Sequence, residues 1–466
     1  MPTYKTPDVY IEEISVFPPS VAEVETAIPA FIGYTEIAKK NAVNDLILKP
    51  TKIYSLKEYE QYYGYPEDDA IAITVADDPT TGGFTVSVFS EPVVKYLMYY
   101  SVKMFFDNGG GQCYIIAVGT YQATPVIDLN GDATSFGLQD GLDALALEDE
   151  PTLIVIPEAV KLTATEYQTL VQAVLLQCNK LRDRFAIFDI FDGEFNLDTT
   201  LLNTNRGYFG NNHLKYGAAY YPFLKTTLNF YVNDAETNVD VTYGGNPAAD
   251  LITFKSSNTA LYNFVKSAIK ERFLKLPPSG AVAGIYAATD SNRGVWKAPA
   301  NVSLANVIEP VIKLDNDKQD GLNVDATTGK SINAIRAFMG KGTLVWGART
   351  LAGNDNEWRY IPVRRFFSVV EESVKKSTYW AVFEPNDANT WVKVRGMIEN
   401  YHTQKWREGA LAGATPKEAF YVKCGLGITM TAIDILEGRM NVEIGMAVVR
   451  PAEFIILKFS HKLQTS

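Results

Sequence analysis

Histidine and cysteine are scarce in this chain. Only three of each occur among its 466 residues. The three cysteines form no CxxC pair, which argues against a zinc knuckle or a redox motif and favours buried thiols in a reducing compartment. The histidines form neither HExxH nor any pair at metal-ligand spacing, and they are His213, His402 and His461. We therefore expect no metal site.

Positive charge and long apolar runs are also lacking. The 43 basic and 54 acidic residues give a net charge of −11, so a nucleic-acid-binding surface is not expected. No apolar run approaches the roughly 18 residues that a membrane span needs, which predicts no membrane insertion. The N-terminus has neither a basic n-region nor an apolar h-region. We expect a protein that is made in the cytoplasm and stays soluble there.

The motifs of catalytic sites are incomplete. No GxSxG nucleophile elbow occurs. Gly329-Lys330-Ser331 resembles the end of a phosphate loop, but Val324 stands where the first glycine is needed. Two acidic stretches, residues 128–132 and 315–321, lack the glycine and glutamate positions of a calcium loop and are interpreted as solvated loops. The sequence thus predicts no catalytic residue, no cofactor and no enzyme.

Aromatic residues, by contrast, are plentiful. The chain has 26 tyrosines and 24 phenylalanines, within an ordinary globular balance of 47% hydrophobic and 21% charged residues. Tyrosine fills cores and is also enriched at protein–protein interfaces, and composition alone leaves both interpretations open.

Helical and strand patterns alternate along the chain. Capping boxes at Ser55/Glu58 and Thr163/Glu166 mark two helix starts. Residues 65–90 and 229–258 are rich in turn-forming residues and are expected to be surface excursions. The pattern predicts an α/β protein with mixed (α+β) sheets. The expected helices are 56–64, 92–106, 163–182, 259–274, 331–339, 362–383 and 389–409, and the expected strands 113–118, 153–156, 185–191, 343–346, 428–433 and 440–449.

Both ends of the chain have a strand-like pattern. A terminal strand has unpaired backbone groups along its edges, so it must pair with a sheet of its own or of another chain. Two ordinary edge strands within one domain remain an equal alternative. The residues expected to take part in strand exchange between subunits are Val9, Tyr10, Ile11 and Ile14 at the N-terminus, and Ile455, Leu457, Phe459 and Leu463 at the C-terminus.

Specific strings, in order along the chain, resemble the contractile tail sheath proteins of phage tails, R-type bacteriocins and extracellular contractile injection systems. The family usually begins Tyr-x-x-Pro-Gly-Val-Tyr, and here Asp8 replaces the glycine. The strings do not cover the two expected surface excursions, residues 65–90 and 229–258. The matching strings are YKTPDVYIEE at 4–13, TAIPAFIG at 26–33, FFDNGGGQCY at 105–114, PPSGAVAGIY at 277–286, GVWKAPAN at 294–301, WGART at 346–350, VRR at 363–365, FEPND at 383–387 and residues 445–454.

The resemblance implies a division of the chain into arms and domains. We expect an N-terminal arm at 1–22, an inserted outer domain at 23–276, an inner core domain at 277–453 and a C-terminal arm at 454–466. Family members assemble as stacked rings, expected here to be six-fold, around an inner tube. Contraction drives the tube through a target envelope without a cofactor. The terminal arms cross to neighbouring subunits and complete their sheets.

The resemblance also implies partners. Those expected are other copies of the chain, the inner tube protein, baseplate and terminal cap proteins, and sibling sheath proteins. Assembly would take place in the bacterial cytoplasm, for a phage tail or a released or anchored tail-like particle. Candidate tube contacts are basic residues of the helix expected at 389–409, namely Lys393, Arg395, Lys405 and Arg407. The alternative function is a non-contracting cap or a tube-associated component of the same kind of particle.

Overall fold

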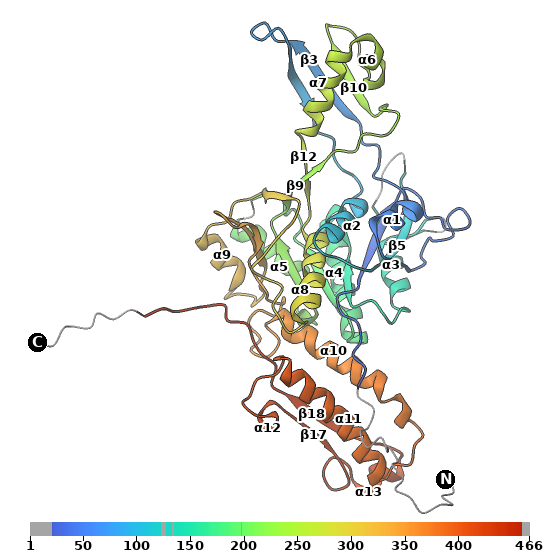
Figure 1. The fold of residues 1–466 in the computed structure, drawn as a ribbon, viewed down its shortest axis with the longest axis vertical. Helices are drawn as coiled ribbons and strands as arrows, with labels where there is room; N and C mark the ends of the chain where they lie inside the picture. The colour runs from blue at the N-terminus through green and yellow to red at the C-terminus, as the bar shows by residue number, and fades with distance from the viewer. Residues whose placement is uncertain (1–20, 123–126, 133–134, 197, 459–466) are drawn as a thin grey trace, which may run out of the picture. The chain divides into compact units, whose positions relative to one another are not determined.

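The chain forms two compact units. The computed structural model describes residues 21–122, 127–132, 135–196 and 198–458 (Figure 1). In its described part, unit 1 consists of residues 21–24 and 369–449, and unit 2 consists of residues 25–368 and 450–458. Each unit thus contains segments that are distant in the sequence.

A nine-stranded sheet lies at the centre of unit 2. Six adjacent strands are parallel, and three antiparallel strands lie at the two edges. This mixture confirms the predicted fold class. The order across the sheet is β13 (Val302–Ser303), β16 (Gly342–Val345), β15 (Asn333–Phe338), β8 (Gly217–Tyr221), β7 (Phe185–Asp189), β6 (Leu153–Val155), β1 (Pro29–Thr35), β5 (Cys113–Thr120) and β2 (Thr51–Ile53).

Both faces of this sheet are buried, as a largely parallel sheet requires. Every residue of β1 is buried, and alternate side chains enter two different cores: Phe31 on one face, Ala30 and Ile32 on the other. Helices α1 (Leu56–Tyr63), α2 (Met98–Asp107) and α8 (Ser279–Arg293) contribute to the first core. The second core receives side chains from α3 (Leu138–Leu145), α4 (Ala164–Leu181), α5 (Thr199–Tyr208) and α9 (Asn316–Asn323).

Helices α2 and α8 pack unusually closely, through two glycines. A Cβ at Gly280 would lie 2.4 Å from the Ser101 carbonyl oxygen, and one at Gly284 would lie 2.5 Å from the Phe105 carbonyl oxygen. Ordinary contact begins at 3.4 Å. The spacing of four residues places both glycines on one face of α8, so the lack of a side chain there allows the two backbones to approach.

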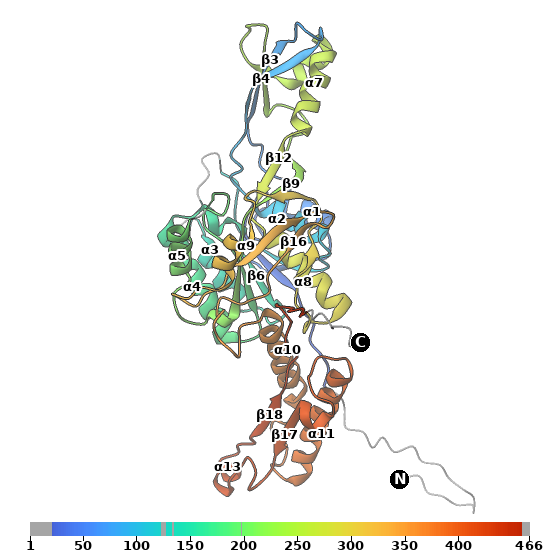
Figure 2. The same ribbon diagram turned by 90° about the vertical axis from the view of Figure 1, so that its left-hand side faces the viewer.

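The two predicted excursions join in one four-stranded sheet (Figure 2). Strand β3 (Ile71–Asp77) pairs in parallel with β10 (Val239–Tyr243), so residues about 170 positions apart are neighbours. Buried Ile73 and Val241 belong to the larger core of unit 2. Strands β4 (Phe84–Ser90) and β11 (Ala249–Asp250) and helices α6 (Leu251–Ser257) and α7 (Thr259–Lys270) complete this part; β12 (Phe273–Leu276), β9 (Leu224–Asn229) and β14 (Val307–Pro310) form a three-stranded sheet.

Unit 1 is a small helix-and-hairpin structure. Its core is formed by the buried side chains Ala381, Val394, Ile398 and Val422. Helix α11 (Ala388–Arg407) packs against the antiparallel pair β17 (Phe420–Cys424) and β18 (Val442–Met446). The remaining elements are the last turns of α10 (Ile361–Ser377), η3 (Tyr379–Ala381), α12 (Pro416–Ala419) and α13 (Ala432–Leu436).

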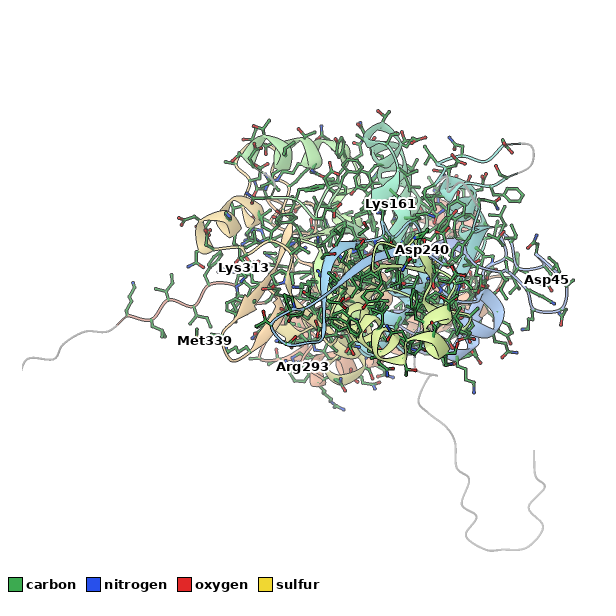
Figure 3. All side chains as sticks on the ribbon, turned by 90° about the horizontal axis from the view of Figure 1, so that it is seen from above. Asp45, Lys161, Asp240, Arg293, Lys313 and Met339 are labelled. Carbon is green, nitrogen blue, oxygen red and sulfur yellow. The ribbon has the colours of Figure 1, made fainter. Side chains whose placement is uncertain are left out.

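Three predictions of secondary structure were wrong. The helix expected at 331–339 is strand β15, because this segment pairs with β8 on one side and β16 on the other; the fully exposed Met339 lies in the turn that follows β15 (Figure 3). The strand expected at 428–433 is a turn leading into α13, which Thr431 caps. The acidic stretch 315–321 is largely helix α9, capped by the Asp315 carboxylate, and not a solvated loop.

One helix start differs from the prediction, and the helix α8 was missed. Helix α2 begins at Met98 and not near 92, because the buried Glu158 carboxylate accepts the backbone N–H groups of Leu97 and Met98. Helix α8 was not predicted. Its first turn follows two prolines, and the Asp189 carboxylate accepts the backbone N–H of Ser279 at 2.7 Å. In both cases a residue distant in the sequence stabilises the helix start.

The division into units differs from the expected domain boundary at 276/277. Strands β13, β14, β15 and β16 and helices α8 and α9 all follow that boundary, and they are integral to the sheets and cores of unit 2. The division in the C-terminal half instead falls between Ser368 and Val369, inside α10. The segment before β1 does join the C-terminal part, since residues 21–24 belong to unit 1.

Candidate assembly site

The described residues hold no group of three or more histidine, cysteine, aspartate or glutamate side chains that could bind a metal ion. Within the same residues, no helix is long and apolar enough to cross a membrane. Lys330, in the string that resembles a phosphate loop, is buried, and its Nζ donates to the Arg206 carbonyl oxygen at 2.8 Å. This ammonium is therefore engaged within the protein and unsuited to a phosphate, which leaves the surfaces of the chain to be considered.

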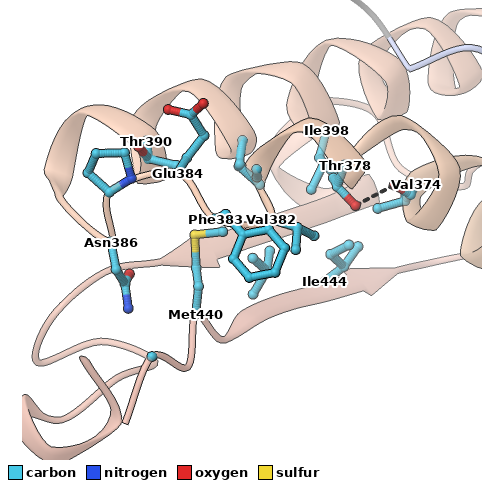
Figure 4. Close-up of a pocket in the computed structure, with 15 residues that line it drawn as sticks. Val374, Thr378, Val382, Phe383, Glu384, Asn386, Thr390, Ile398, Met440 and Ile444 are labelled. Atoms are coloured by element: carbon cyan, nitrogen blue, oxygen red, sulfur yellow. Dashed lines mark hydrogen bonds between the residues drawn. The ribbon is translucent and has the colours of Figure 1, made fainter. Parts of the chain in front are cut away.

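An apolar groove of about 710 Å³ runs along unit 1 (Figure 4). It lies among the end of α10, the turn after η3, helix α11 and strand β18. Side chains of Val394 and Ile398 form its inner wall and also belong to the core of unit 1. The lining residues are Val374, Thr378, Ala381, Val382, Phe383, Glu384, Pro385, Asn386, Thr390, Val394, Ile398, Gly438, Met440, Val442 and Ile444.

Phe383 is the one aromatic residue among those that line this groove. Its side chain is fully exposed beside Val382 and Met440 (Figure 4). Its backbone has a φ of +69°, a conformation that non-glycine residues rarely adopt. An exposed phenylalanine held in a strained turn contributes nothing to burial in the monomer, and residues of this kind concentrate at functional surfaces. The string FEPND at 383–387 was the sequence signal for this feature, although the groove itself was not predicted.

Strand β18 borders the groove and has an open edge. Within the described part of the chain, β17 and β18 pair only with each other as strands. A two-stranded sheet is marginally stable alone, and its outer edges present unpaired N–H and C=O groups. Val442 and Ile444 of β18 also line the groove. Unit 1 therefore combines an apolar surface with a backbone edge able to accept a further strand.

The C-terminal segment is attached to the protein at Glu453, and the residues after Glu453 are apolar and exposed. Glu453 makes a two-oxygen ion pair with Arg349: Nε lies 2.9 Å from Oε1 and Nη2 lies 2.5 Å from Oε2. The hydrogen bonds from Glu453 raise the pKa of the buried Arg349 guanidinium above its usual range. Beyond this pair, residues 454–457 have no regular secondary structure and are between 71% and 80% exposed. They are Phe454, Ile455, Ile456 and Leu457.

The predicted strand-exchange residues lie mainly outside the described residues. Ile455 and Leu457 are exposed, as a segment that binds elsewhere should be. The other two C-terminal residues and all four N-terminal ones fall outside: Phe459, Leu463, Val9, Tyr10, Ile11 and Ile14. Strand exchange by these residues therefore stays a prediction.

The N-terminal segment has a fixed point of its own, in unit 1. The backbone N–H groups of Ala22 and Val24 donate to the hydroxyls of Ser377 and Ser373 at 3.0 and 3.1 Å. Between them, the Glu23 carboxylate lies 2.5 Å from the Lys405 ammonium. These contacts fix residues 21–24 along α10 and α11.

One candidate tube contact does not fit its predicted role. Lys405 is 5% exposed and is paired with both Glu23 and Glu408, so its ammonium is not available to a tube. Burial lowers the pKa of Lys405, but the two carboxylates outweigh it and raise the pKa above its usual range. Lys393 and Arg407 are exposed on α11, and the half-buried Arg395 lies 3.7 Å from Glu399.

Two family models match the sequence. The model described as the phage tail sheath protein central domain matches residues 131–351, and the model described as the phage tail sheath C-terminal domain matches residues 353–462. The tail sheath protein of Vibrio phage KVP40 is 27% identical over 142 residues, which are 30% of this chain and 21% of that protein. The matched segments cover only 19–30% of the length of the curated relatives.

Two solved structures are similar over almost the whole chain. A chain of the anti-feeding prophage helical sheath in its contracted state has 30% identity and a TM-score of 0.65, with 99% of this chain and 100% of that chain covered. A chain of the anti-feeding prophage baseplate structure has 30% identity and a TM-score of 0.64, with the same coverage. The similarity includes both units and both excursions. The matching strings of the sequence analysis did not cover the excursions.

Proposed function

Because this chain belongs to the contractile tail sheath family, we propose that it is the sheath subunit of a contractile injection particle. It polymerises helically around an inner tube, and contraction of the polymer drives the tube through a target cell envelope. The observation that carries this proposal is the similarity, over 99% of the chain, to a sheath structure in the contracted state. A mechanical role of this kind needs neither a cofactor nor a catalytic residue.

The proposed contact between subunits is strand addition at unit 1. The open edge of β18 offers backbone groups, and the groove beside it offers apolar surface for alternate side chains of an added strand. The exposed segment 454–457 of a neighbouring copy supplies apolar residues that match this surface, and Ile455 and Leu457 point to the same side of an extended strand. Residues 9–14 and 459–463 take part in the same exchange under this proposal.

Further partners are the inner tube, the baseplate, a terminal cap and sibling sheath proteins in stacked six-fold rings. The similarity to a chain of a baseplate structure supports association with a baseplate. Of the candidate tube contacts, the exposed Lys393 and Arg407 and the half-buried Arg395 remain in the proposal. The particle is assembled in the bacterial cytoplasm and acts as a phage tail or a tail-like particle.

Electron microscopy of the purified protein, with and without tube, tests the function. We expect long helical sheaths that form on the tube. Monomers or isolated closed rings at high concentration with tube present would refute the sheath proposal, and rings would favour a cap.

Truncation tests the arms. Deleting residues 1–14, or residues 455–466, should leave a folded monomer, with an unchanged circular dichroism spectrum, that no longer builds long sheaths. Normal assembly and contraction of either truncated protein would show that strand exchange through that arm is wrong.

A further inference from the structure

The two terminal segments share a feature that strand exchange does not require. Each contains one glutamate that is paired with a nearly buried basic residue of the folded body. In unit 1, Glu23 pairs with Lys405, and in unit 2, Glu453 pairs with Arg349. The basic side chains are only 6% and 4% exposed, whereas the glutamates are 35% and 17% exposed. In each pair the folded unit thus contributes the basic side chain, and the terminal segment contributes the carboxylate.

Arg349 is held in place independently of the segment. Both its backbone N–H and its carbonyl oxygen are hydrogen bonded to the buried Asn333 side chain, each at 2.8 Å. Its Nη1 donates to the Asn323 carbonyl oxygen at 3.2 Å. The Tyr360 hydroxyl adds a longer contact of 3.4 Å to Glu453. The guanidinium therefore presents a fixed fork to the carboxylate, which gives geometric specificity as well as attraction.

The N-terminal pair is built similarly. Lys405 also binds Glu408 at 2.8 Å, so it keeps one carboxylate partner if Glu23 leaves. The serine hydroxyls that bind Ala22 and Val24 fix the backbone on both sides of Glu23. The N-terminal segment is thus attached at three consecutive residues before it enters β1.

We propose that the pairs Glu23–Lys405 and Glu453–Arg349 are the anchors that fix the two arms to their own subunit and bear the load when a neighbouring copy pulls on an arm. This inference rests on the proposed function and adds positioning residues to it. In the C-terminal half, Val449 is hydrogen bonded to Ala410 in unit 1, and Glu453 is held in unit 2. A pull on residues 454–458 therefore meets the ion pair before it reaches β18.

Anchoring also sets how well an arm finds its partner. If Glu453 is released, the free segment begins at residue 450, and both its length and its range of directions increase. A longer, undirected tether lowers the effective concentration of the arm at a neighbouring subunit. The anchor therefore favours assembly without contacting the neighbour.

The glutamates allow a test that leaves the body folded. Glu23→Gln leaves Lys405 paired with Glu408, and Glu453→Gln leaves Arg349 bound to Asn323. We expect each variant to remain folded, with an unchanged circular dichroism spectrum, and to raise the protein concentration needed for sheath assembly on the tube by about tenfold or more, since a hydrogen bond to a charged group contributes a factor of that order. The charge exchange of Glu453→Arg with Arg349→Glu should restore part of the loss.

Glu408→Gln is the matched control. It removes the other carboxylate from the same lysine, but Glu408 belongs to the end of α11 and not to the arm. Under the anchor proposal, Glu408→Gln assembles like the parent and Glu23→Gln does not. If the two variants are equally impaired, or if Glu23→Gln and Glu453→Gln assemble like the parent, the anchor proposal is wrong.

A second readout does not depend on assembly. A spin label on the exposed Ala452→Cys should be slow in the parent monomer and fast when Glu453 is changed to glutamine. Unchanged label motion would overturn the anchors even if assembly is impaired. If the parent protein fails to assemble at all while the label responds as expected, the anchors stand and the proposed sheath function falls.

Discussion

Replacing Gly284 with alanine tests the packing of α8 against α2, because two effects predict opposite signs. Helix propensity alone predicts that alanine stabilises the helix interior by about 1 kcal/mol. The structure places the new Cβ 2.5 Å from the Phe105 carbonyl oxygen and 2.8 Å from the Asn108 Cβ. Ordinary van der Waals contact of a Cβ begins at 3.4 Å, so the two helices must move apart by almost 1 Å to bring the 2.5 Å contact to that distance.

The cost of that separation exceeds the gain. A gap of 0.5–1 Å removes roughly a quarter to a half of the dispersion energy of the atoms facing it, and overpacking a buried site typically costs about 1–3 kcal/mol. We therefore expect Gly284→Ala to lower the free energy of unfolding by up to about 2 kcal/mol. Gly280→Ala should behave alike, since its Cβ would meet backbone atoms of Ser101, and the double variant should cost less than the sum because one separation relieves both clashes.

Gly321→Ala is the control. This glycine lies in α9, with nothing within 4 Å of the added Cβ, so alanine should stabilise by about 0.5–1 kcal/mol. Urea unfolding followed by circular dichroism gives the free energies, and hydrogen exchange at the α2 and α8 amides locates the loss. If Gly284→Ala is as stable as Gly321→Ala, close helix packing does not explain the glycines of this string.

Three further predictions concern single residues. Phe383→Ala should change the free energy of unfolding of the monomer by less than about 0.5 kcal/mol, because the side chain is exposed. The same variant should impair sheath assembly seen by electron microscopy. Normal assembly would show that the groove does not take part in the contact between subunits. Burial raises the pKa of Asp189 to about 7 from an ordinary value of 3.8. The contribution of the protonated carboxyl to the free energy of unfolding is therefore complete below pH 4 and is lost as the pH rises to 7, by up to roughly 4 kcal/mol. Asp189→Asn should flatten the pH dependence of urea unfolding between pH 4 and 7, and an unchanged pH dependence would contradict the raised pKa of Asp189. Arg365→Met should lower the free energy of unfolding by about 3–5 kcal/mol, because it leaves the Asp290 carboxylate buried without its 2.5 Å partner; a loss below 1 kcal/mol in thermal or urea unfolding would contradict this.

Elements with strong local signals could be predicted from the sequence. Ser55 caps α1 by accepting the backbone N–H of Glu58, and the capping box Thr163/Glu166 sets the start of α4. Apolar runs set β5, β6 and β7. These signals succeed because the residues that decide the structure are within one helical turn or one strand of each other.

Predictions failed where a distant residue decides. The segment 333–338 has helix-forming residues, yet pairing with β8 and β16 makes it a strand. Helix α8 depends on the Asp189 carboxylate, 90 residues earlier, and on close contact with α2. Lys405 illustrates the same limit at the candidate site, because its basic side chain suggested an exposed contact and only the fold brings Glu23 to it.

By itself, the sequence determined the fold class, the absence of complete catalytic motifs and, through ordered strings, the resemblance to tail sheath proteins. Only the tertiary structure decided where the units divide, that the excursions form one sheet, and that the groove, the open strand edge and the two ion pairs lie where they do. The physical reason is that these features are made by residues roughly 20 to 400 positions apart in the sequence. Their proximity depends on the packing of whole elements, which no local pattern encodes.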